Sequence, residues 1–325
     1  FTGSSFSAPG PVNCSFDAVR VACILGVRHF FPELPRHSSI SKWIRVTVPE
    51  QSFLNAKFPQ PVGGATLEVV PRIVSGIFEI FSSRLHGRGQ VGGGGGANLI
   101  VLQGEKKGKP YLMRLNLCGG GGASGRGDGL SNCNLRTRFP SFPSLEQLER
   151  DYPIRVKTYK LRAESGGAGR YIGGMGSVFE FELLEEIGLL TIFYDRNRRG
   201  PGGARKGARG ATTEVILRRK ENWLQLTNLS KVEDICLKKG DRLVISSAGG
   251  GGYGHPYERA IRLLSKDMKS GFLSRREAAM NHGVVYQNED GTDYDSNKTF
   301  RLRSYKLTIA DIEGILDEIQ DMDSA

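Results

Sequence analysis

Three runs of consecutive glycine constrain this chain more than any other feature of its sequence. They lie at 92–96, 119–122 and 249–252, and the last one follows a short apolar run that is typical of a β-strand. Glycine makes up 44 of the 325 residues, about twice its usual share, whereas proline is ordinary at 14. This composition excludes collagen and proline-rich linkers. It favours a globular fold in which tight turns and close backbone approaches require glycine.

Apolar spacing predicts helices near the start of the chain and strands further on. Helices are expected at 17–31, 71–85 and 144–152, and again at 257–264 and 274–279. The expected buried faces comprise Ala18, Val21, Ala22 and Leu25 in the first helix and Ile73, Ile77, Ile80 and Phe81 in the second. Strands are expected at 98–104, 110–117, 154–162, 177–184, 188–195, 212–219 and 241–247.

These elements predict an α+β, β-rich fold with Gly-rich loops. Residues 1–152 are expected to form a mixed α/β part, and residues 153–287 a β-rich C-terminal part of the same region. Residues 288–325 are predicted to be a polar linker followed by an acidic amphipathic helix.

Charge and cysteine content indicate the compartment and the partners. The net charge is +11, and 196–209 carries six basic residues and no acid, a pattern that suits phosphate or RNA. No window approaches the roughly 20 apolar residues of a membrane span, and no secretory signal is visible. The five cysteines form no CxxC pair. We therefore expect a cytoplasmic protein with reduced thiols and no membrane partner. Because 196–209 is one short loop without interleaved aromatic residues, a nucleic-acid partner is not expected, and RNA binding through this loop is kept as a minor alternative.

Two local patterns allow more than one interpretation. Gly249, Gly251 and Gly254 fit the GxGxxG spacing of a dinucleotide loop, but a run of glycines satisfies that spacing almost automatically. The alternative is a turn that requires glycine. Ser165, before a Gly-rich turn, has the position of a nucleophile but lacks a GxSxG context, so hydrogen bonding within the turn is the alternative.

The histidines give no metal-ligand pattern. They are scattered, without an HxxxH or HxH pair, so no metal site is predicted in this chain. His255 lies beside the third glycine run and is expected either to face a pocket or to lie in a solvated turn.

Several ordered segments together resemble the hydantoinase B/oxoprolinase family, the B-type subunit of N-methylhydantoinases, 5-oxoprolinases, and acetone and acetophenone carboxylases. "SGGAGRYIGGMG" (165–176) is similar to the family's S-G-G-A-G-x-x-R-G-G-x-G. "GGGGASGRGDG" (119–129) resembles its glycine run ending in Asp-Gly, and "VPEQSFLNAKFPQPV" (48–62) its P-E-G-S-x-x-N segment. The third glycine run with its flanks resembles T-P-G-G-G-G-Y-G-D-P-x-x-R. The resemblance extends from Phe1 to about Val285.

The resemblance implies a subunit that completes ring opening or carboxylation after an A-type partner has used ATP. It also implies a divalent metal, whose ligands in the family lie upstream of the matched region. We expect this chain to bind no cofactor itself, with ATP on the partner. A homo-oligomer remains open.

Several positions depart from the family pattern: Ile172 replaces an Arg, His255 an Asp and Ala248 a Pro. Polar and loop residues on the matching segments are the candidates for a pocket or an interface. They are Asp128, Ser165, Gly166, Gly167, Gly169, Arg170, Asp195, Arg196, Gly250, Gly251, Tyr253 and His255.

The leading hypothesis is a subunit for ATP-dependent hydrolysis of a cyclic amide such as hydantoin or 5-oxoproline, inactive when isolated. One alternative is a truncated, non-enzymatic or repurposed homologue that serves as a scaffold or tailoring protein. Another is a subunit of the acetone/acetophenone carboxylase type. No residue is assigned a catalytic role from the sequence.

Overall fold

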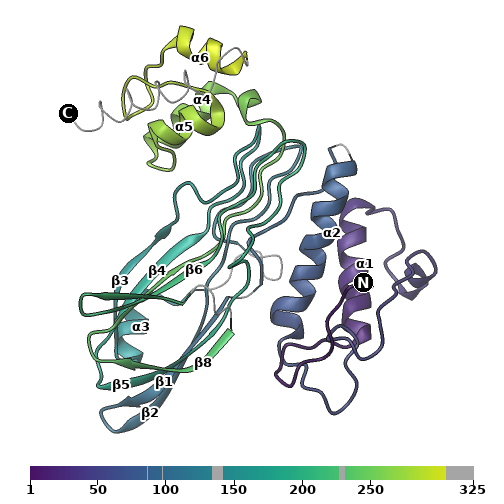
Figure 1. Cartoon of the computed structure of the whole chain (residues 1–325), viewed down its shortest axis with the longest axis vertical. Helices are drawn as coiled ribbons and strands as arrows, with labels where there is room; N and C mark the ends of the chain where they lie inside the picture. The colour runs from purple at the N-terminus through teal and green to yellow at the C-terminus, as the bar shows by residue number, and fades with distance from the viewer. Residues whose placement is uncertain (86, 97, 134–141, 227–230, 305–325) are drawn as a thin grey trace.

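Two antiparallel sheets enclose the largest apolar core of the protein (Figure 1). The computed structural model describes residues 1–85, 87–96, 98–133, 142–226 and 231–304. One sheet has the order β2-β1-β5-β8 and the other β3-β4-β9-β6-β7. The strands are β1 (Leu99–Lys106), β2 (Lys109–Asn116), β3 (Ile154–Leu161), β4 (Ser177–Leu183), β5 (Ile187–Phe193), β6 (Glu214–Arg219), β7 (Asn222–Gln225), β8 (Lys231–Lys238) and β9 (Arg242–Ser246).

Alternating side chains explain how these strands form a sandwich. In β4, Phe179, Phe181 and Leu183 are fully buried, whereas the glutamates between them are only partly covered. Facing residues of β1, β2 and β5 complete the same core. The hairpin between β1 and β2 turns through Lys107 and Gly108, both at positive φ, as the favoured two-residue turn requires.

All seven strands expected from the sequence are present, and β7 and β8 were not expected. β7 is only four residues long and exposed throughout. β8 lies at a sheet edge, and its charged residues interrupt the apolar alternation. β1 pairs with β2 on one side and with β5 on the other, so the sheet crosses the boundary expected at residue 152. The domain division itself stays a prediction.

The glycine-rich segments form a bundle of extended chains that runs from the sandwich towards the C-terminal helices (Figure 1). We call residues 91–96, 119–123, 165–176, 200–211 and 247–254 the glycine bundle. The N–H groups of its last segment donate in turn to different neighbours, in the pairs Gly249–Ala211, Gly250–Gly174, Gly251–Gly92, Gly252–Ala208 and Tyr253–Tyr171. Donors three residues apart bond to the same neighbouring segment: Gly249 and Gly252 donate to 200–211, and Gly250 and Tyr253 donate to 165–176. This repeat is that of a helix with three residues per turn, as in polyproline II.

Glycine is required in the bundle because the backbones touch. A Cβ on Gly250 would lie 1.8 Å from the carbonyl oxygen of Gly121, and one on Gly167 would lie 2.2 Å from that of Ala208. Gly167 is not at positive φ, so close approach and not an unusual backbone angle excludes a side chain there. The three-residue hydrogen-bond repeat also explains why these segments are neither strands nor α-helices.

This arrangement contradicts the dinucleotide interpretation of the third glycine run. The N–H groups from Gly249 to Tyr253 all donate to backbone carbonyls and do not form a phosphate cradle. The run leads into η3 (Pro256–Glu258), a turn of three residues, instead of an α-helix.

Two helices, α1 (Phe16–Phe30) and α2 (Val70–Arg84), pack side by side next to the bundle (Figure 1). Ser15 caps α1 by accepting from the N–H of Ala18. Gly26 lets the helices approach, since a Cβ there would lie 2.8 Å from Ile77. Short turns η1 (Ser38–Lys42) and η2 (Ala65–Val69, π-helical) complete this region.

The expected buried faces of these two helices were partly wrong. Val21, Leu25 and Ile80 are at least half exposed. α1 is apolar on more than one side, and the contact at Gly26 selects the side that faces α2. The buried residues of α1 are Val19, Ala22, Cys23, Gly26 and Phe30.

The remaining helices have polar surfaces and small cores. α3 (Leu145–Asp151), capped by Ser144, buries Leu148 in the sandwich core. α4 (Ile261–Lys269), α5 (Arg275–His282) and α6 (Ser296–Arg303) form a separate cluster at the far end of the bundle (Figure 1). α6 occupies part of the segment expected to be linker. The expected acidic helix lies outside the described residues. No helix among those described is long and apolar enough to cross a bilayer.

Candidate functional site

A cavity of about 340 Å³ lies where η2 and α2 meet the ends of β5 and β8. Its wall is mostly apolar, and four charged side chains enter it from different elements. The apolar residues are Val12, Phe53, Leu54, Val69, Ile73 and Phe193. The charged ones are Glu68, Arg72, Asp195 and Lys231.

Glu68 is the most buried charged group of this cavity. Its Oε2 lies 2.6 Å from Nζ of Lys231, while Oε1 is buried without a hydrogen-bond donor. Burial raises the pKa of the Glu68 carboxyl to about 7, although the Lys231 ammonium acts to lower it. Gly96 permits this position, because a Cβ there would lie 2.2 Å from the carbonyl oxygen of Leu67.

Asp195 follows β5 and carries the second carboxylate. Its Oδ1 accepts from the N–H of Arg196 at 2.7 Å, and its buried Oδ2 accepts no hydrogen bond. The Nε of Arg72 lies 3.8 Å from that Oδ2. The cavity therefore holds two carboxylates and two cations, and one oxygen of each carboxylate is buried without a hydrogen-bond donor.

Arg196 is directed away from this cavity, into the contact between α2 and the bundle. Its guanidinium is 3% exposed and donates to Ser75 at 2.6 Å and to Glu79 at 3.0 Å. Burial, and then the charge of Arg72, lower the pKa of Arg196. Arg196 thus joins α2 to the glycine bundle.

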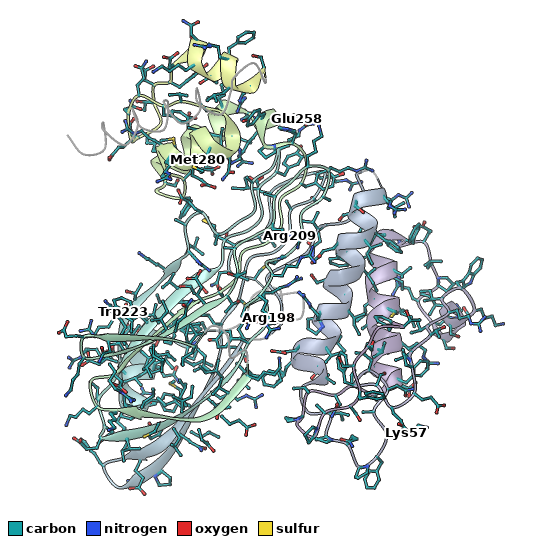
Figure 2. The ribbon with its side chains drawn as sticks, in the orientation of Figure 1. Lys57, Arg198, Arg209, Trp223, Glu258 and Met280 are labelled. Carbon is teal, nitrogen blue, oxygen red and sulfur yellow. The ribbon has the colours of Figure 1, made fainter. Side chains whose placement is uncertain are left out.

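The rest of the basic segment is also part of the fold. Arg205 and Arg209 donate to the carbonyl oxygens of Arg84 and Gly200. Figure 2 shows Arg198 and Arg209 beside the bundle, on the side that faces α2. Arg196, Arg205 and Arg209 are three of the six basic side chains of 196–209, and all three make contacts within the chain. This weakens the interpretation of the segment as an RNA-binding loop.

Most of the other candidates lie inside the glycine bundle. Ser165 is 1% exposed, and its hydroxyl donates to Arg162 and accepts from the N–H of Gly176. Ser165 therefore forms hydrogen bonds within the turn, which was the alternative to its interpretation as a nucleophile. Among the described residues, its hydroxyl is bonded to backbone groups and not to a histidine. The glycines at 166, 167, 169, 250 and 251 each face a neighbouring backbone. Tyr253 is buried there too, and its hydroxyl accepts from the N–H of Gly87.

Asp128 takes part in an ion pair that joins the bundle to the C-terminal helices. Arg259, 1% exposed, donates to both Asp128 oxygens at 2.7 and 2.9 Å and to Asp267 of α4 at 2.9 Å. Arg170 supplies a backbone carbonyl to the same guanidinium. His255 caps η3 by accepting from the N–H of Tyr257.

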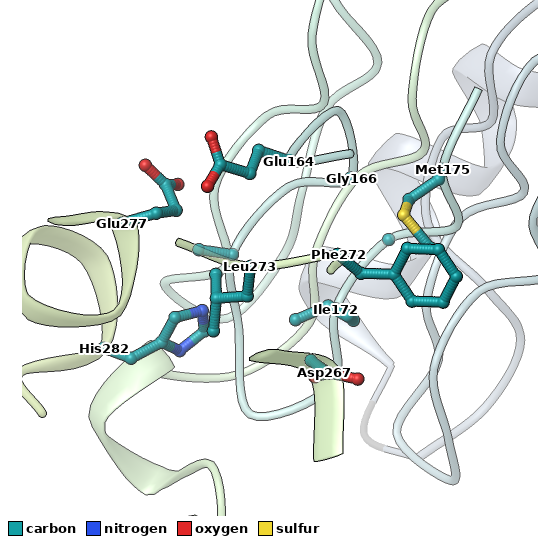
Figure 3. Close-up of a pocket in the computed structure, with 11 residues that line it drawn as sticks. Glu164, Gly166, Ile172, Met175, Asp267, Phe272, Leu273, Glu277 and His282 are labelled. Carbon is teal, nitrogen blue, oxygen red and sulfur yellow. The ribbon is translucent and has the colours of Figure 1, made fainter. Parts of the chain in front are cut away.

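A second, smaller cavity lies between the bundle and α4–α5 (Figure 3). At about 30 Å³ it has room for little more than one water. Glu164 and Glu277 face each other at its edge, and burial, then Glu164, raise the pKa of Glu277. Burial lowers the pKa of His282 to about 4. This cavity is a contact between elements and is too small for a substrate.

Metal ligands are not gathered in the part of the chain that the structure describes. No group of three or more His, Cys, Asp or Glu side chains lies close enough there to hold an ion. Glu68 and Asp195 are only two carboxylates, each beside a cation, so this donor set does not fit a divalent metal. The absence of a tightly bound metal stays a prediction.

Of the candidates named from the sequence, Asp195 lines the cavity of about 340 Å³. Sequence reasoning did not name Glu68, Arg72, Lys231 or Arg259. Glu68 and Lys231 are 163 positions apart (231 − 68) and meet only through the fold. Arg259 closes the T-P-G-G-G-G-Y-G-D-P-x-x-R pattern, so the motif itself contained that signal.

Comparison with known proteins identifies the family of this fold. A model of the family described as hydantoinase B/oxoprolinase matches residues 1–256, and the chain belongs to that family. The chain is also similar to a Pseudomonas sp. (strain NS671) protein described as the B-type component of a D-/L-hydantoinase. The two are 24% identical over 279 residues, which cover 83% of this chain and 45% of that protein.

Two solved structures share the fold. The ATP-dependent caprolactamase of Pseudomonas jessenii aligns with a TM-score of 0.79 and 20% identity, over 93% of this chain and 54% of that one. An acetone carboxylase in its nucleotide-free form aligns with a TM-score of 0.75 and 16% identity, over 94% and 46%. The chain therefore spans about half the length of these relatives.

Proposed function

We propose that this chain is a B-type component of an ATP-dependent enzyme that opens a cyclic amide together with an A-type partner. The observation that carries the proposal is the likeness to caprolactamase over 93% of the chain, joined with membership of the hydantoinase B/oxoprolinase family. The apolar cavity with its carboxylates supplies a site of suitable size for a small ring.

The backbone hydrogen bonds of the glycine loops support the assignment of ATP binding to the partner. Their N–H groups are engaged with neighbouring backbone carbonyls from Gly249 to Tyr253, so they are not offered to a nucleotide phosphate. The metal that the resemblance implies would be held by ligands other than Glu68 and Asp195. A cytoplasmic location belongs to the same proposal.

The proposal is tested by reconstituting the chain with an A-type hydantoinase subunit. We expect the mixture to release the ring-opened product: an amino acid from 5-oxoproline or caprolactam, or an N-carbamoyl amino acid from hydantoin. ADP should form in proportion to that product. Each subunit alone, and the mixture without ATP, are the controls. ATP-coupled hydrolysis by this chain alone would contradict the assignment of ATP to the partner.

Two alternatives are decided by the same mixture. The carboxylase hypothesis, which shares only the fold with acetone carboxylase, predicts bicarbonate-dependent consumption of acetone or acetophenone and no lactam hydrolysis. The scaffold hypothesis rests on Ile172 and His255, where the family pattern has Arg and Asp. It predicts a complex that forms but turns over neither class of substrate.

A further inference from the structure

We propose that four exposed basic side chains of residues 196–209 form a docking surface for the acidic segment 308–323 of the same chain. The four are Arg198, Arg199, Lys206 and Arg209, and we call them the basic face. This contact lies within one polypeptide and involves no substrate, so it does not depend on the proposed function. The family model matches residues 1–256, and the acidic segment lies beyond that range.

The two segments have opposite charge. Residues 196–209 carry six basic side chains and no acid, whereas residues 311–323 carry six acidic side chains and no base. Arg196 is paired with Glu79, but in the part of the chain that the structure describes no carboxylate pairs with the basic face. Like charges held close together repel one another, and an acidic segment laid over them relieves that repulsion.

The backbone holds the basic face together. A Cβ on Gly200 would lie 1.8 Å from the carbonyl oxygen of Gly210, so the two ends of 200–211 are in contact. Arg198 and Arg199 precede the first of these glycines, and Arg209 precedes the second. Figure 2 shows Arg198 and Arg209 beside the bundle. A surface whose backbone is already ordered binds at a lower entropic cost.

The acidic segment is close enough along the chain to reach the basic face. Arg303 of α6 donates to the carbonyl oxygen of Arg259, which follows η3, so the last described residues lie near the C-terminal end of the bundle. The bundle segment 247–254 spans about 25 Å at about 3.1 Å per residue. A chain of the length of 305–325 spans about 70 Å when fully extended. Such a short tether favours binding within one chain over binding between copies.

The helices nearer to Ser304 offer a less suitable surface. Their bases are mixed with acids, such as Asp267 of α4 and Glu277 of α5. Arg303 of α6 already donates to two backbone carbonyls. We therefore assign the acidic segment to the basic face and treat the lysines of α4 and α6 as the competing positions.

The test is zero-length cross-linking of the full chain with a carbodiimide. The reagent joins a lysine amine to a carboxylate as an amide and takes up the water that is lost, and mass spectrometry locates the new bond. Lys206 is the one lysine in residues 196–209. We expect it to cross-link to an acid of 311–323 within the monomer. The yield should fall severalfold at about 1 M salt, where the screening length is about 3 Å.

Matched variants place the contact on the basic face. Arg198→Ser combined with Arg199→Ser removes two exposed charges and should lower the yield at Lys206 by about threefold or more. Arg36→Ser combined with Arg45→Ser removes the same charge from exposed positions in the N-terminal region and should leave the yield unchanged. Thermal melts verify that both double variants fold.

Three results would overturn the inference: no cross-link between Lys206 and 311–323, cross-links confined to a dimer, or the same yield in both double variants. Cross-links confined to a dimer would assign the acidic segment to a second copy of the chain. Cross-links to the lysines of α4 or α6 in place of Lys206 would assign it to the C-terminal helices. Those lysines are Lys266, Lys269 and Lys298.

Discussion

At the scale of single residues, the protein depends on a few charged side chains that the fold has withdrawn from water. Arg259 is an example, because its guanidinium joins the loop of Asp128 to Asp267 of α4 while remaining 1% exposed. Replacing one partner of a buried ion pair is costly because the other charges remain without compensation. Arg259 therefore stabilises the attachment of the C-terminal helices to the bundle.

Arg259→Met is expected to lower the unfolding free energy by about 3 kcal/mol or more, since two carboxylates lose their cation. Urea melts of the variant and the wild type measure this, read at constant m-value. Arg262→Met, on the exposed side of α4, is the control and should change the midpoint little. Equal shifts in the two variants would show that the buried ion pair does not stabilise the fold.

Glu68 gives a prediction about pH. Its folded-state pKa of about 7 lies above its ordinary value, so between roughly pH 4.5 and pH 7 the folded protein binds more protons than the unfolded chain. Stability from this group is then present at acid pH and is lost as pH rises to 7. Relative to Glu68→Gln, the wild type should lose on the order of 2 kcal/mol between pH 5 and pH 7.5. Urea melts at both values check it, and parallel behaviour of the two proteins would contradict it.

At the scale of elements, the glycine bundle replaces side-chain packing with backbone contacts. Gly167→Ala is expected to destabilise the fold by roughly 1 kcal/mol or more, because its Cβ would lie 2.2 Å from the carbonyl of Ala208. Gly76→Ala is the matched control. Gly76 lies within α2 with nothing near its missing Cβ, so that change should stabilise by about 0.5–1 kcal/mol. A midpoint for Gly167→Ala at or above the wild-type value would mean that the bundle tolerates side chains.

Elements also show what the sequence could and could not predict. Strands with clean alternation, such as β4, were predicted from period two alone. The edge strand β8 was missed because its exposed charges hide that period. The orientation of α1 was missed because Val21 and Leu25 are as apolar as the residues that α2 covers. The Glu68–Lys231 pair depends on contacts between distant segments, which no local pattern encodes.

At the scale of the whole molecule, we expect the purified chain to keep no stoichiometric metal after dialysis. The reason is that its histidines are scattered and that the described residues hold no cluster of three ligands. Elemental analysis of the dialysed protein measures it, with a protein of known zinc content carried through the same steps. Stoichiometric zinc or manganese would contradict the prediction.

The glycine bundle also bears on how the molecule responds to temperature. Its segments are held by peptide hydrogen bonds, and its own apolar cluster is limited to Val91, Ala123, Ala204, Tyr253 and Tyr171. Exposing apolar surface raises the heat capacity of unfolding, whereas exposing peptide groups lowers it. The bundle therefore contributes chain length without the usual increment of heat capacity. We therefore expect the stability curve of this protein to be flatter than that of a sandwich of equal length, with less loss of stability on cooling.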